Sequence, residues 1–108
     1  MTYPVFLTRN AQRNVRGILS YLKQRSKRGA EAWHGRWMEV LNILKTTAGG
    51  CSLAIESGDH AIELRQTTFK TRHGLPYRAV FIVRDGECLI LHVRGPGQDL
   101  IPPDEIGI

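Results

Sequence analysis

The side chains best able to bind or transform a charged partner are cations and a histidine in the second half of this 108-residue chain. They lie in or beside segments expected to be strands: Arg65, Lys70, Arg72, His73, Arg78 and Arg94. Arginine and lysine bind phosphates and carboxylates, and histidine can act as an acid or base near neutral pH. The histidines are scattered and the two cysteines lack metal-ligand spacing, so the sequence indicates no metal site and no cofactor.

The two halves of the chain differ in charge. Residues 1–55 contain nine Lys and Arg but two acids, whereas residues 56–108 contain six Lys and Arg and eight acids, within a net charge of +5. A basic half favours a polyanionic or acidic partner such as RNA, DNA or an acidic protein segment. The alternative is a solvated helix surface without a partner, and the charge does not decide between them.

The length indicates a single domain, residues 1–108, whose residues 96–108 form an irregular tail because Pro102 and Pro103 interrupt regular structure. The sequence contains no run of about 18 apolar residues, so it does not predict a membrane-spanning segment. The start, MTYPVFLTRN, does not resemble a signal peptide. We therefore expect a cytoplasmic protein.

A short strand and two helices should precede the basic strands. Val5 and Leu7 fit a strand, and Thr8 or Asn10 can cap the helix that follows. Two apolar stripes at helical spacing follow: Ala11, Val15, Ile18, Leu19, Leu22, and then Trp33, Trp37, Val40, Leu41, Leu44. The basic turn KQRSKRG joins them, which predicts an antiparallel helical hairpin with both tryptophans in the core.

After Gly49–Gly50 the pattern changes to that of strands. Residues 61–69 alternate as one strand, and residues 70–76 form a loop. Asp85-Gly86 favours a two-residue type I′ turn in the hairpin formed by residues 77–94. Strict alternation from this turn pairs Ala79 with His92 and places Arg78 on the face opposite to Arg94.

Both faces of this hairpin are apolar. The face with Phe81, Val83 and Ile90 should receive the helices, and His92 points the same way, which favours a structural role. The other face carries an apolar strip: Val80, Ile82, Leu89 and Leu91. Either the tail covers this strip through Leu100 and Ile101, or the strip is a groove for a partner.

The order strand, helix, helix, three strands, together with YRAVFIVRDGECLILHVRG, resembles the RelE/ParE family of toxins from type II toxin–antitoxin pairs, also known as plasmid stabilisation proteins. The resemblance extends from Tyr3 to Gly95, and Tyr77-Arg78 is its most specific part. It implies an α+β fold, in which an N-terminal strand and a two-helix antiparallel hairpin pack on a mainly antiparallel sheet that ends in a β-hairpin.

The family contains two activities, and the resemblance leaves both open. ParE-like members poison DNA gyrase, whereas RelE-like members are ribosome-dependent endoribonucleases that cut mRNA. In a nuclease, Arg78 and Arg65 would be the catalytic candidates, because they would stabilise charge as the RNA 2′-hydroxyl attacks the phosphate. Arg78 matches the family's third-strand arginine, but Ala61 and Glu63 stand where nucleases place lysines, and the tail lacks a basic residue or tyrosine.

We therefore expect a toxin that arrests growth, most simply as a ParE-like gyrase poison. The alternatives are a RelE-like nuclease and a non-catalytic binding relative. Lys70, Arg72, His73 and Arg94 are candidates for binding nucleic acid or the target, whether gyrase or the ribosome with its mRNA. The apolar strip of Val80, Ile82, Leu89 and Leu91 is the candidate surface for a cognate antitoxin, which could form a hetero-oligomer with the toxin. Arg78 could instead form a simple salt bridge to Glu63.

Overall fold

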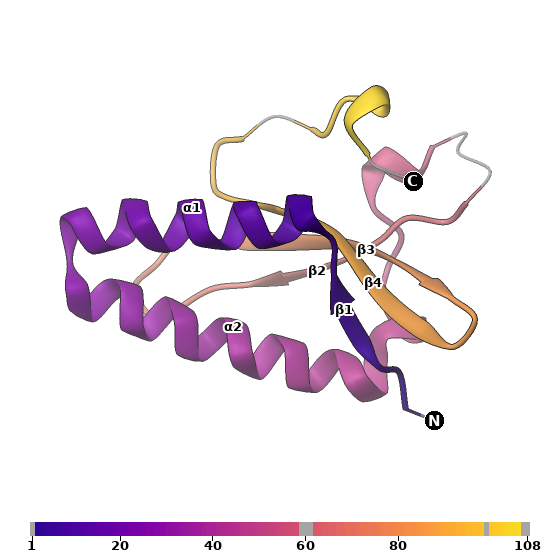
Figure 1. Cartoon of the computed structure of the whole chain (residues 1–108), viewed down its shortest axis with the longest axis horizontal. Coiled ribbons are helices and arrows are strands. Elements are labelled where there is room, and N and C mark those ends of the chain that lie inside the picture. Colours follow the sequence, from indigo (N-terminus) through magenta and orange to yellow (C-terminus); the bar gives the residue numbers. More distant parts are fainter. Residues whose placement is uncertain (1, 59–61, 99, 107–108) are drawn as a thin grey trace.

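The computed structural model describes residues 2–58, 62–98 and 100–106 and has the predicted α+β architecture (Figure 1). Strand β1 (Val5–Leu7) leads into helices α1 (Arg9–Arg25) and α2 (Lys27–Thr47). Strands β2 (Arg65–Phe69), β3 (Tyr77–Arg84) and β4 (Glu87–Arg94) follow, with short 3₁₀ turns at Ala48–Gly50, Ile55–Ser57 and Pro103–Glu105. The four strands form one sheet in the order β1-β4-β3-β2, in which β1 is parallel to β4 and the other pairs are antiparallel.

Both helices begin where a hydroxyl can cap them. The Thr8 Oγ1 accepts a hydrogen bond from the Ala11 N–H at 3.1 Å, and the Ser26 Oγ accepts one from the Gly29 N–H at 3.0 Å. Each bond satisfies an amide that the first helical turn leaves without a partner. Ser26 is also the only residue between α1 and α2, so the two helices form the expected tight antiparallel hairpin.

Helix α1 also completes the sheet. Strand β1 pairs only with Cys88–Ile90, so the outer edge of β4 continues beyond it. There the Thr8 hydroxyl donates to the Leu91 carbonyl at 3.2 Å, and the Asn14 Oδ1 accepts from the Val93 N–H at 3.0 Å. Side chains of α1 therefore satisfy backbone groups that an edge strand would otherwise expose.

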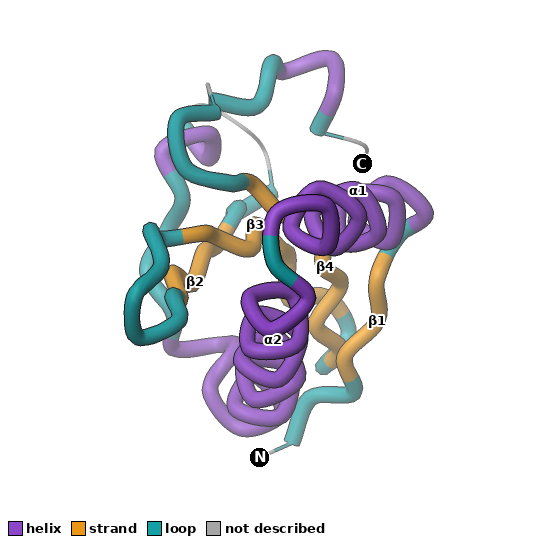
Figure 2. The backbone as a smooth tube through the Cα atoms, turned by 90° about the vertical axis from the view of Figure 1, so that its left-hand side faces the viewer, coloured by secondary structure: helices purple, strands orange, loops and turns teal. Residues whose placement is uncertain are grey.

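The two faces of the sheet have different covers. Figure 2 shows α2 and the C-terminal segment on opposite sides of the strands. The helix-covered face holds the larger cluster, in which Trp33 and Trp37, each 2% exposed, pack with Phe69 and Phe81. This confirms that the tryptophans belong to the core. On the tail-covered face, Val80, Ile82 and Leu91 pack with Ala54, Leu64, Ile101 and Ile106.

The β3–β4 hairpin has the predicted turn, but its register changes after four pairs. Asp85 and Gly86 both have positive φ, and the pairs next to the turn form as expected: Arg84–Glu87, Val83–Cys88, Ile82–Leu89 and Phe81–Ile90. A β-bulge then leaves Leu91 as an extra residue, so Val80 pairs with His92 and Arg78 pairs with Arg94. The predicted pairing of Ala79 with His92 is therefore wrong.

Candidate functional site around Arg78

Arg78, the residue that best supports the family resemblance, forms an ion pair with Glu56. Its Nη1 donates to the Glu56 Oε1 at 2.8 Å, its Nη2 donates to the Oε2, and Nη1 also donates to the Gln66 Oε1 at 3.1 Å. The Arg78 side chain is 18% exposed and the Glu56 side chain only 2%. The prediction that Arg78 pairs with Glu63 is wrong, because Glu63 forms an ion pair with Arg65 at 3.0 Å instead.

The carboxylate of Glu56 also holds the tail. Its Oε2 accepts a hydrogen bond from the Ile101 N–H at 3.0 Å. Burial favours the uncharged acid, but the bonds from Arg78, from the Ile101 amide and from its own amide outweigh this and lower the pKa of Glu56 to about 2. One ionised carboxylate therefore joins strand β3 to the C-terminal segment.

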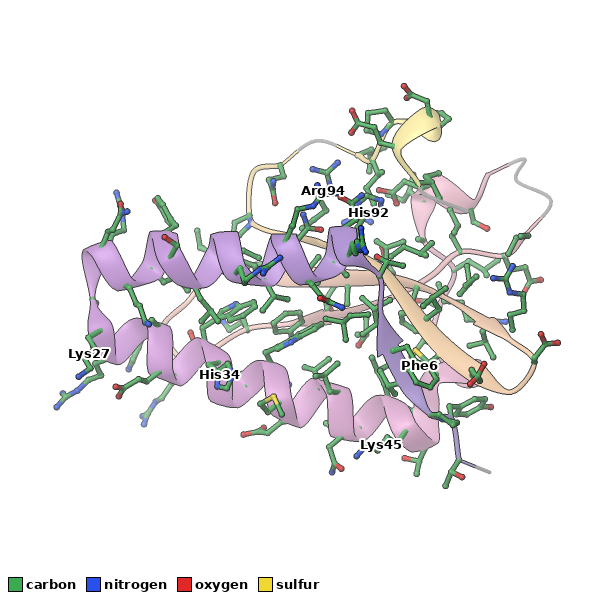
Figure 3. All side chains as sticks on the ribbon, viewed as in Figure 1. Phe6, Lys27, His34, Lys45, His92 and Arg94 are labelled. Atoms are coloured by element: carbon green, nitrogen blue, oxygen red, sulfur yellow. The ribbon has the colours of Figure 1, made fainter. Side chains whose placement is uncertain are left out.

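His92 and Arg94 share the tail-covered face with Arg78, contrary to both predictions. The His92 Nε2 lies 3.2 Å from the Ile106 carbonyl oxygen, so the ring contacts the tail and not the helices. Arg94 lies directly opposite Arg78 on the neighbouring strand, and directly paired residues of antiparallel strands project to the same face. The extra residue of the bulge, Leu91, reverses the alternation and causes both errors. Figure 3 shows His92 and Arg94 on the side of the sheet where the tail lies.

Arg65 does not join this group. It pairs with Phe81, so it projects to the helix-covered face, whereas Arg78 projects to the other. Its Nη1 donates to the Cys51 carbonyl at 2.6 Å, which ties β2 to the segment that follows α2. The structure therefore does not bring the two predicted catalytic arginines to one site.

The remaining predicted cations surround a different part of the molecule. Lys70, Arg72 and His73 are exposed in the loop between β2 and β3. His73 lines a cavity of about 450 Å³ against the helical hairpin, together with Tyr77, which precedes Arg78. Burial, with a smaller effect of the nearby Tyr21, raises the pKa of Tyr77, so its phenol stays uncharged at neutral pH.

The apolar strip expected to bind an antitoxin is not an open groove. Val80, Ile82 and Leu91 are at most 1% exposed, and Leu89 is partly buried. The cover comes from the chain itself, through Ile101 and Ile106 of the tail and through Ala54 and Leu64. Of the two alternatives that the sequence left open, the structure confirms cover by the tail, through Ile101 as expected, but with Ile106 in place of Leu100, which is 51% exposed. Antitoxin binding at these residues stays a prediction that requires the tail to move.

Sequence reasoning missed Glu56 and Gln66, the two partners of Arg78. Gln66 projects from β2 to the same face of the sheet as Arg78. Its contact with Arg78 could therefore have been predicted if the register of β2 with β3 had been known. Glu56 lies in the 3₁₀ turn Ile55–Ser57, within a stretch that has no periodicity, and no sequence signal identifies it.

The arrangement gives three positively charged or titratable groups on one sheet face, of which one guanidinium is already neutralised. Arg78 can bind an external anion on this face only if the carboxylate of Glu56 leaves it. Among the described ranges, no helix is long and apolar enough to cross a membrane.

In comparisons with known proteins, no family model, no curated protein and no solved structure matches this chain.

Proposed function

We propose that this protein is the toxin of a type II toxin–antitoxin pair, that it arrests growth as a ParE-like poison of DNA gyrase, and that a cognate antitoxin neutralises it in the cytoplasm. The element order and Tyr77-Arg78 at the start of β3 support the family. The observation that carries the choice within the family is the ion pair between Arg78 and Glu56. Arg78 is held by its own chain, which favours a binding protein over a nuclease.

The second candidate is a RelE-like ribosome-dependent endoribonuclease. The pairing of Arg78 with Arg94 on one face favours it, since two adjacent guanidinium groups suit a phosphate. This activity requires Glu56 and the tail to leave Arg78, and Arg65 would contribute nothing because it projects to the other face. A relative that only binds a partner remains the third alternative.

The substitution Arg78→Lys separates these activities. Lysine keeps a charge for Glu56 but loses the planar, bidentate guanidinium that a phosphate site uses. We expect induced expression of the wild type to arrest growth, and the purified protein to inhibit gyrase supercoiling without cutting mRNA in a reconstituted translation reaction. Arg78→Lys should retain both effects.

The matched control is Arg84→Lys, at an exposed position next to the hairpin turn. Mapped ribosome-dependent cuts in mRNA that disappear in Arg78→Lys and persist in Arg84→Lys, with gyrase unaffected, would establish the nuclease. Absence of growth arrest, gyrase inhibition and mRNA cuts would leave the binding relative.

A further inference from the structure

We propose that a cleft between α1, the β2–β3 loop and residues 95–98 binds single-stranded nucleic acid and takes up an unpaired base beside Trp33. This inference goes beyond the proposed toxin activity and does not rest on it. It does not involve the Arg78 face, and of the tail it uses only Pro96 and Gln98.

The cleft consists of two adjoining cavities. One has a volume of about 520 Å³ and the other about 450 Å³, within the range of small-ligand sites. Both are lined by Tyr21, Tyr77 and Pro96. Because they share these three residues, the cavities form one elongated cleft that follows α1 toward its C-terminal end.

Aromatic rings stand where the two cavities meet. Tyr21 is 54% exposed, and the Arg25 guanidinium lies 4.9 Å from the centre of its ring. The ring of Tyr77 is held in place by the core, since it packs edge-on against Trp33 at 5.4 Å and stacks on Phe69 at 6.0 Å between ring centres. One accessible ring and one rigid ring are a suitable platform for planar bases, which stack on aromatic side chains regardless of sequence.

Trp33 supplies a hydrogen-bond donor without an acceptor. It lines the second cavity and is 2% exposed, yet its Nε1 has no partner within the described part of the chain. A buried donor left unpaired destabilises the fold, and most buried donors have a partner. The Nε1 itself is enclosed, but the indole ring lines the cavity, so a base that enters it would lie against Trp33.

Positive charge lies on the two segments that border the second cavity. Arg25 lies over the ring of Tyr21, which lines the cavity, and the facing β2–β3 loop, whose Thr71 and His73 line it, carries the exposed Lys70 and Arg72. Lys23 and Lys27 do not contribute, because they line a separate cavity with Glu31, and Lys27 projects into solvent (Figure 3). Two cationic segments on either side of aromatic rings match a chain of phosphates whose bases enter between them.

An acidic peptide with an apolar anchor would meet the same charges. The tyrosine platform favours bases, because planar bases stack on the ring faces. Duplex nucleic acid is also disfavoured, because its bases are not free to enter a cavity.

The test measures fluorescence anisotropy of labelled twelve-residue oligo(dT) and oligo(U) with the full chain at about 50 mM salt. We expect both oligonucleotides to bind, and Tyr21→Ala to weaken binding about tenfold through loss of one stacked base. The double variant Lys70→Ala/Arg72→Ala should also weaken binding and should lower the slope of log K against log salt by about 1.4.

Two matched controls lie at the other end of the molecule. Phe6→Ala removes an aromatic ring that is 50% exposed on β1, and Lys45→Ala removes a cation near the end of α2 (Figure 3). Neither should change the affinity by more than about twofold, since neither contacts the cleft. Quenching of tryptophan fluorescence by the oligonucleotide should be lost in Tyr21→Ala and retained in both controls.

Several results would overturn the proposal. These are no binding up to about 100 µM protein, equal affinity for a duplex of the same length, or binding that Arg78→Lys abolishes and Tyr21→Ala leaves intact. Tyr21-dependent binding of a hexaglutamate peptide with a central Phe, without binding of oligonucleotides, would assign the cleft to a protein partner. Growth arrest and gyrase inhibition are scored separately, so failure of the cleft and failure of the toxin proposal are distinguishable.

Discussion

The two faces of the sheet are both apolar, but they are closed in different ways. On the helix-covered face, regular helices bring Trp33, Trp37 and Leu44 onto Phe81 and Ile90, and the cluster consists of apolar side chains. On the tail-covered face, irregular chain supplies Ile101 and Ile106, and a buried carboxylate and a histidine fasten it through hydrogen bonds. The first face depends on buried area, whereas the second depends as well on the charge of one side chain.

The difference between the two faces predicts which part of the molecule should lose stability when the pH changes. Hydrophobic burial is non-directional and hardly changes with pH. An ion pair with a nearly buried carboxylate is directional, and its contribution depends on protonation. The tail-covered face should therefore be the part of the molecule that responds to acid, and the helix-covered face should set the baseline stability.

The largest loss of stability should follow Phe81→Ala on the helix-covered face. Phe81 is fully buried, and truncation leaves a cavity that the sheet cannot fill, so the free energy of unfolding should fall by about 4 kcal/mol. Urea denaturation followed by circular dichroism measures this change. Phe6→Ala, at a half-exposed ring, should change stability by less than about 0.5 kcal/mol. A loss below about 1 kcal/mol for Phe81→Ala would contradict the role given to this face.

A loss of about 3 kcal/mol should follow Glu56→Gln on the tail-covered face. The amide keeps the shape of the carboxylate but leaves the guanidinium of Arg78 without a counter-charge in a largely buried position. The exposed pair of Glu63 with Arg65 provides the control, and Glu63→Gln should change stability by less than about 1 kcal/mol. Equal effects of the two substitutions in the same denaturation experiment would remove the contrast between a buried and an exposed ion pair.

Acid should weaken the wild type more than Glu56→Gln. The pKa of Glu56 is lowered from 4.5 to about 2 in the folded protein, so its stabilising contribution is present above pH 4.5 and is lost as the pH falls toward 2. A shift of this size corresponds to about 3 kcal/mol. The difference in unfolding free energy between wild type and variant should shrink by that amount from about pH 6 to about pH 2. Parallel stability curves for the two proteins would show that Glu56 is not the group responsible.

A smaller loss, about 2 kcal/mol, should follow Ile106→Ala. Ile106 is 2% exposed, but it lies in an irregular segment just after the short turn Pro103–Glu105, where the backbone can adjust after truncation. Hydrogen exchange should show faster exchange at the Ile101 amide, which bonds to Glu56, and unchanged exchange in α2. Faster exchange in α2 as well would mean that the two faces unfold as one unit.

The sequence was sufficient for the parts of the fold that rest on periodicity and local turn chemistry. The helical stripes and the basic turn KQRSKRG predict the hairpin, although only Ser26 of that turn lies outside the helices, and Asp85-Gly86 predicts the first four pairs of β3 with β4. The bulge at Leu91 gives no such signal, because Leu91 is an ordinary strand residue without the glycine that can mark a bulge. The residues of β4 that follow Leu91 were therefore assigned to the wrong face of the sheet, including His92 and Arg94.

The candidate site was less accessible to sequence reasoning for the same physical reason. Arg78 could be identified from its place after Tyr77, but its partner Glu56 comes from a turn that no pattern predicts and lies twenty-two positions away in the chain. Arg65 was assigned to the same site because both arginines lie on strands. Only the pairing of Arg65 with Phe81 shows that the two project to opposite faces.

The parallel pairing of β1 with β4 has a consequence for synthesis. Strand β1 is synthesised long before its partner strand, as the 83-residue separation of the Thr8–Leu91 hydrogen bond indicates. At about 5 to 20 residues per second, the nascent β1 waits between about 4 and 17 s for β4 to be made. The helical hairpin can form during this interval, whereas the sheet cannot be completed. A growing chain therefore completes this sheet only after β4 has been made, which gives any newly made partner time to meet the chain as it folds.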